Sequence, residues 1–85
     1  MKTRVAVLAI IVEDAASVPQ LNYLLHENSE RIIGRMGIPY RAKKINVMSV
    51  AVDAPQDVTA ALTGKIGALP GIRVKTAYSQ FESDE

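Results

Sequence analysis

Two short stretches, residues 5–12 and 45–52, carry no strongly polar face at either odd or even positions. Both are rich in β-branched side chains, and the first is closed by the acids Glu13 and Asp14. This pattern is typical of strands that lie in the middle of a sheet and are covered on both faces. The chain is therefore expected to fold around two central strands.

Two further stretches, residues 30–39 and 72–78, alternate apolar and charged residues, as half-buried strands do. Pro39 has no N–H to donate, so we expect the first of them to lie at a sheet edge or to end at Pro39. The apolar residues at alternate positions are predicted to face the core; they are Ile32, Met36, Ile38, Ile72 and Val74. The positions between them, on the opposite face, include the cations Arg31, Arg35, Arg73 and Lys75.

Two stretches with the periodicity of helices lie between these predicted strands. Residues 17–28 begin with Ser17 and Gln20 at the spacing of a capping box, and apolar residues then recur every three or four positions. Residues 55–69 begin with Pro55, a favourable residue for the first turn, and end before Pro70 and Gly71. The predicted core residues of the two helices are Leu25 and Leu62.

The resulting order is strand, helix, strand, strand, helix, strand. It predicts an α+β fold of the ferredoxin-like βαββαβ type, a four-stranded antiparallel sheet with two helices on one face. In this topology the first and third strands are central, which agrees with their apolar character. We expect one domain over residues 1–79 and an acidic, frayed tail over residues 80–85.

Composition excludes several classes of protein. The 85-residue chain has no cysteine, so disulfides and thiolate-held metal clusters are excluded. The net charge of +1 gives no global attraction to nucleic acid or to an acidic membrane. The apolar run at residues 5–12 is too short to span a bilayer, and we expect a soluble cytoplasmic protein.

The sequence predicts no catalytic or metal-binding residues and no cofactor. His26 is the only histidine, and its place near the end of a helix favours an interaction with the terminal carbonyls over a metal site. The segment Gly64–Gly67 matches the four letters of a GXXG nucleic-acid clamp, but it lies within a helical stripe. Helix packing and helix termination explain these glycines better.

Basic residues gather between the second and third predicted strands. A nucleic-acid-binding module is one interpretation, and a solvated basic edge that discourages edge-to-edge pairing is the other. An RNA-recognition motif shares this element order but stacks bases on aromatic residues of its central strands, which this chain lacks there. The candidate basic surface is Arg31, Arg41, Lys43 and Lys44, and the candidate anion or ligand contacts are Arg35, Arg73 and Lys75.

The sheet face without helices is predicted to show an apolar band flanked by four cations, Arg31, Arg35, Arg73 and Lys75. A monomer rarely leaves such a band in water. We therefore expect a homo-oligomer, a dimer or a dimer of dimers, formed through this face or through an edge strand.

Nearly the whole chain resembles the iron-only hydrogenase system regulator family. The most specific stretches are residues 34–41 (Gly-Arg-Met-Gly-Ile-Pro-Tyr-Arg) and 62–67 (Leu-Thr-Gly-Lys-Ile-Gly). The resemblance implies a short ACT-like domain, similar in fold to the C-terminal domain of nickel-responsive regulators. The histidines and the cysteine that hold nickel in those regulators have no counterparts here.

The resemblance also implies a regulatory or ligand-sensing role in transcriptional control rather than catalysis. The partners expected on this interpretation are further copies of the chain and a small-molecule effector. Alternative interpretations are direct nucleic-acid binding through the basic surface and an adaptor that docks onto another protein.

Overall fold

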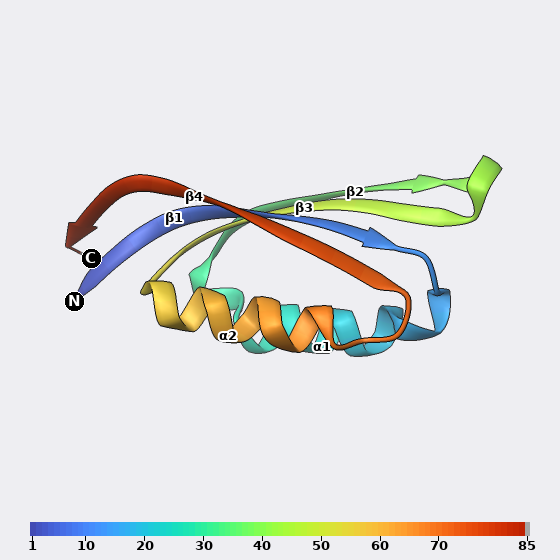
Figure 1. Ribbon diagram of the computed structural model, residues 1–85, viewed down its shortest axis with the longest axis horizontal. Helices are drawn as coiled ribbons and strands as arrows, with labels where there is room; N and C mark the ends of the chain where they lie inside the picture. Colours follow the sequence, from blue (N-terminus) through green and yellow to red (C-terminus); the bar gives the residue numbers. More distant parts are fainter. Residues whose placement is uncertain (85) are drawn as a thin grey trace.

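The sheet order β2-β3-β1-β4 places the two doubly apolar strands in the middle, as predicted. In the computed structural model, which describes residues 1–84, all neighbouring strands are antiparallel. The elements in chain order are β1 (Lys2–Val12), α1 (Val18–Glu27), β2 (Ile32–Tyr40), β3 (Ile45–Ala54), α2 (Gln56–Gly67) and β4 (Ile72–Asp84). The predicted ferredoxin-like fold is thus confirmed (Figure 1).

Both helices cover the same face of the sheet and leave the other face open (Figure 1). The core lies between these layers and is built from alternate positions of β1 and β3, which meet the buried stripes of α1 and α2. Leu25 and Leu62 are buried, at 1% and 4% exposed, as predicted. The largest fully buried side chains are Leu8, Ile10, Leu21, Leu25, Ile66, Val12, Val50, Val52 and Thr59.

A bulge in β2 reverses the predicted orientation of most of that strand. Ile32 pairs with Val52 but Gly34 pairs with Ala51, so Ile33 is an extra residue on β2. One extra residue exchanges the two faces of all that follows. Ile32 therefore contacts the core, whereas Met36 and Ile38 lie on the open face, contrary to the prediction.

Strand β4 is longer than the sequence predicts. It continues to Asp84 and pairs with Lys2–Arg4 at the start of β1, so residues 80–84 are not a frayed tail. Opposite charges face each other along this extension: Arg4 lies 3.0 Å from Glu82, and Lys2 lies 3.6 Å from Asp84. The extension follows from pairing with the N-terminal residues, which the local pattern of the tail does not reveal. Glu85 lies outside the described residues.

The connections at one end of the sheet are held together by polar contacts. Ser17 does not cap α1 as predicted; its hydroxyl donates to the carbonyl oxygen of Pro70 at 2.6 Å. The Glu13 N–H donates to the Gly71 carbonyl oxygen at 2.7 Å. Asp14 caps the 3-10 turn Ala15–Ser17 that precedes α1, since its carboxylate accepts from the Ala16 N–H at 2.9 Å. The β1–α1 connection is therefore fastened to the α2–β4 connection.

Within residues 1–84, α1 and α2 are each too short to cross a membrane.

Candidate functional site

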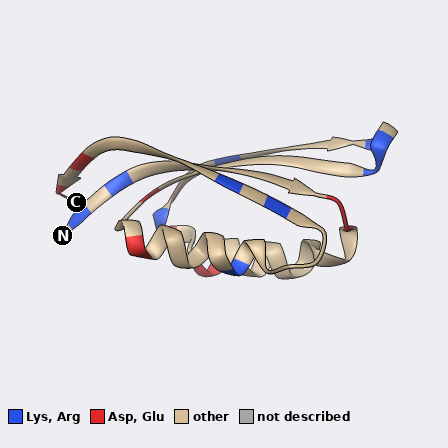
Figure 2. Ribbon diagram, viewed as in Figure 1, with Lys and Arg blue, Asp and Glu red and all other residues tan. Residues whose placement is uncertain are grey.

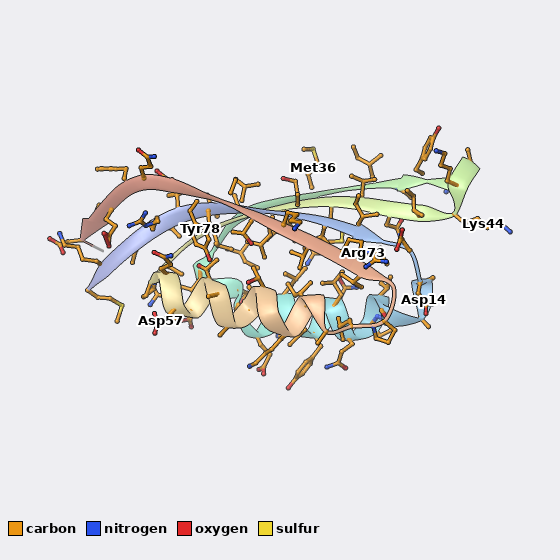
Figure 3. The ribbon with its side chains drawn as sticks, in the orientation of Figure 1. Asp14, Met36, Lys44, Asp57, Arg73 and Tyr78 are labelled. Atoms are coloured by element: carbon orange, nitrogen blue, oxygen red, sulfur yellow. The ribbon has the colours of Figure 1, made fainter. Side chains whose placement is uncertain are left out.

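The open face of the sheet exposes several large apolar side chains. The side chains of β1, β3 and the later part of β2 present large apolar groups to solvent there, and Met36 points directly away from the helices (Figure 3). We call this surface the open-face band and define it as Val5, Val7, Ile11, Met36, Ile38 and Val47, which are 39–63% exposed. The predicted apolar surface is present, although β2 contributes different residues from those expected.

A hollow of about 250 Å³ lies in the middle of the band. Small residues form its floor, because Gly34, Ser49 and Ala51 lie on neighbouring positions of β2 and β3. Val7 and Met36 stand beside it. Sequence reasoning missed this hollow, since the register that brings Gly34 opposite Ala51 depends on the bulge at Ile33.

The structure places two of the four predicted flanking cations on this face. Arg73 and Lys75 lie on β4, opposite Ile11 and Ala9 of β1, and Arg73 makes an exposed ion pair with Glu13 at 3.3 Å. Arg35 lies on the helix side because of the bulge, and Arg31 lies in the short turn before β2. The prediction of four cations around the band is therefore wrong for Arg31 and Arg35.

A second hollow, of about 270 Å³, lies on the helix side between α1 and the β2–β3 pair. We call it the α1–β2 pocket. Its apolar lining includes Val12, Leu21 and Met48, and its polar lining is Asn22, Arg35 and Asn46. The Arg35 guanidinium donates to the Asn22 side-chain oxygen at 3.2 Å. This pocket joins a cation, two amides and an apolar wall, which is the usual composition of a small-molecule site.

Arg73 and Lys75 line a third hollow of about 400 Å³, which wraps around the edge of β4 next to Gly67. The three predicted anion contacts are thus not brought together: Arg35 belongs to the α1–β2 pocket, and the other two belong to the β4 edge.

The predicted basic surface is also divided. Arg41 and Lys43 form a short 3-10 turn with Lys44 at the tip of the β2–β3 hairpin, which extends beyond the helices (Figure 2). Lys44 adopts a left-handed conformation, with φ of 57°. Arg31 lies at the opposite end of β2. A compact cationic tip of three residues therefore replaces the continuous cluster of four.

The other residues considered in the sequence, His26 and Gly64–Gly67, lie in the two helices. His26 is exposed in the last turn of α1. Across residues 1–84, no three His, Asp or Glu side chains gather as a metal-binding group. Gly64–Gly67 forms the last part of α2, which ends at Gly67. Close packing is found at Gly67, where a Cβ would meet Val74 at 3.3 Å, and not at Gly64, where a Cβ would meet no atom within 4 Å.

Comparison with known proteins agrees with the fold. None of the curated proteins matches the chain. A formyltetrahydrofolate deformylase from Pseudomonas putida KT2440 has a TM-score of 0.62 at 13% identity, over 86% of this chain and 28% of that one. An unknown protein from Galdieria sulphuraria has a TM-score of 0.62 at 19% identity, over 93% and 46%. At these identities the likeness concerns the fold alone.

A third structure is much more similar. The uncharacterized protein TM1266 from Thermotoga maritima has a TM-score of 0.88 at 34% identity, over 92% of this chain and 99% of that one. The family described as TM1266-like, iron-only hydrogenase system regulator, matches residues 4–76. The chain therefore belongs to the TM1266-like family, whose description is "Iron-only hydrogenase system regulator, putative".

Proposed function

We propose that this protein is a non-enzymatic regulatory domain that senses a small effector in the α1–β2 pocket. Membership of a regulator family supports a regulatory role. The effector site is inferred from the position of Arg35. The bulge in β2 turns this residue toward the helix side, where it lines a pocket with apolar walls.

The chemistry of the pocket favours a small carboxylate with a short apolar group. A guanidinium offers five N–H donors in a planar fork that matches a carboxylate. Asn22, which already holds Arg35 at 3.2 Å, orients that fork, and Asn46 adds a further amide. Val18, Pro39 and Met48, which line the pocket and are at least partly exposed, would contact the apolar part of the ligand. The volume of about 270 Å³ lies near the lower end of the usual range for ligand sites, which favours a ligand of few atoms.

Thermal unfolding with a panel of short aliphatic carboxylates and aliphatic amino acids tests the proposal. A ligand at ten times its Kd stabilises the folded state by about 1.4 kcal/mol, which raises the Tm of a chain of this size by about 5–10 °C. Arg35→Gln is expected to abolish the rise. Arg41→Gln, a matched loss of one guanidinium at the hairpin tip, is expected to keep it. No rise with any member of the panel, or an equal rise in both variants, would contradict the proposal.

A second candidate function is nucleic-acid binding by the hairpin tip. The observation that favours it is the projection of Arg41, Lys43 and Lys44 beyond the helices, on one turn (Figure 2). Binding that rests on phosphate contacts weakens steeply with salt because counterions are released. Lys43→Gln/Lys44→Gln should reduce DNA or RNA binding at low salt. Lys2→Gln/Lys65→Gln, with the same change in charge elsewhere, should not. Equal binding by the two double variants would exclude the tip.

A further inference from the structure

We propose that the open-face band is covered by the same face of a second copy of this chain, with Met36 of each copy seated in the hollow of the other. The inference goes beyond the proposed function, because it concerns the opposite side of the sheet from the α1–β2 pocket. It rests on three properties of the face: its area, its shape and the placement of its charges.

The area is sufficient for a stable dimer. The paired part of β1 and β3 is nine residues long, from Arg4 to Val12. With strands about 4.8 Å apart and a rise of about 3.3 Å per residue, four strands give a face of roughly 20 × 30 Å. This is about 600 Å² per partner, or about 1,200 Å² for two copies, which is the lower limit of the range for specific, stable interfaces. A chain of 85 residues also buries a small share of its own surface, so a partner adds useful burial.

The shape favours a second copy over an unrelated protein. Met36 is the most prominent side chain of the band, at 63% exposed, and the hollow lined by Gly34, Ser49 and Ala51 lies next to it. In a two-fold interface both subunits use the same patch. Met36 of each subunit can therefore enter the hollow of the other, and the contact is made twice. The unbranched methionine side chain adapts readily to the outline of such a recess.

The charges on the face are placed compatibly with this arrangement. Asp53 lies opposite Val5 at one end of the face, and Arg73 lies opposite Ile11 at the other end. A two-fold axis perpendicular to the strands lays each strand over its own counterpart with the ends reversed, so that Asp53 of one copy lies at the end of the partner's face that carries Arg73, two strands away from it. The two Asp53 side chains, and likewise the two Arg73 side chains, are thereby kept at opposite ends of the interface. Between these ends, the band itself offers apolar side chains to its partner.

Sedimentation equilibrium at micromolar concentration tests the pairing. The wild-type chain is expected at twice its monomer mass of 9.2 kDa. Val7→Lys puts an unpaired charge into the covered face and is expected to weaken the dimer at least about a hundredfold. Tyr23→Lys is the matched control, because it also replaces an exposed apolar side chain, 56% exposed, but lies on α1. It is expected to leave the dimer intact.

The seating of Met36 needs a variant of its own. Gly34→Leu is expected to fill the hollow, and there is space for its Cβ, because a Cβ at Gly34 meets no atom within 4 Å. Gly64→Leu adds the same side chain to an equally open position on α2 and serves as control. Gly34→Leu is expected to raise the dimer Kd at least tenfold and Gly64→Leu to leave it unchanged.

Circular dichroism establishes that each variant is folded. If Val7→Lys does not fold, Met36→Glu tests the same face at a more exposed position. A monomeric wild-type chain would overturn the proposal and leave the face to a different protein. A dimer that survives Val7→Lys, Met36→Glu and Gly34→Leu would also overturn it and assign the contact to an edge strand. Neither result depends on whether the α1–β2 pocket binds an effector.

Discussion

Gly71 is the residue whose conformation most constrains the chain. Its φ is +69°, and a Cβ there would collide with the Asp14 side chain and lie 2.9 Å from the Asp14 backbone nitrogen. Its carbonyl oxygen accepts the Glu13 N–H at 2.7 Å, so the chain cannot move aside without losing that bond. Gly71 therefore sets the distance between the β1–α1 and α2–β4 connections.

We expect Gly71→Ala to destabilise the protein by about 2–4 kcal/mol, since left-handed strain of about 1–2 kcal/mol adds to the displacement of Asp14. Gly64→Ala is the matched control: nothing lies within 4 Å of its Cβ position, and alanine in a helix gains about 1 kcal/mol over glycine. Urea unfolding midpoints measure both changes. Similar midpoints for the two variants would show that the Gly71 contact does not constrain the fold.

The order and type of the elements follow from periodicity, because each strand and helix carries its own local pattern. Residues 5–12 and 45–52 have no strongly polar face at odd or even positions, and they lie in β1 and β3, the two central strands of the sheet. The orientation of β2 does not follow, because the bulge at Ile33 is created by pairing with β3 and leaves no local signal. The α1–β2 pocket and the hollow depend on that bulge. The sequence therefore predicts Arg35 as a ligand contact on the open face and Met36 as a core residue, and the structure exchanges their faces.

The extension of β4 likewise depends on a distant segment. Residues 80–84 are polar, and their strand structure comes from pairing with Lys2–Arg4. Deleting residues 80–85 should therefore speed hydrogen exchange of the backbone amides of residues 2–4, because their paired strand is gone. Deleting residue 85 alone is the control and should leave their exchange unchanged. Unaltered exchange after the longer deletion would mean that the extension contributes no protection.

At the scale of the whole molecule, the two faces of the sheet differ in what they carry. One face buries the core against α1 and α2 and holds the α1–β2 pocket at its margin. The other is the open-face band, and the cationic hairpin tip extends past the helices in a molecule 42 Å long and 17–19 Å across (Figure 2). An effector site and a self-association surface on opposite sides of one sheet would share the strands β2 and β3. Arg35 lines both the α1–β2 pocket and the hollow.

Pairing through the open-face band predicts that thermal stability depends on protein concentration. When a folded dimer dissociates and unfolds in one step, mass action raises the Tm with concentration. With about 0.7 kcal/mol of unfolding enthalpy per residue over two 85-residue chains, a tenfold increase should raise the Tm by about 4 °C. Differential scanning calorimetry from about ten micromolar to about one millimolar measures this slope. Val7→Lys should unfold at a Tm that does not vary with concentration, and Tyr23→Lys should keep the wild-type slope. A concentration-independent Tm in the wild-type chain would mean that its cooperative unit is the monomer.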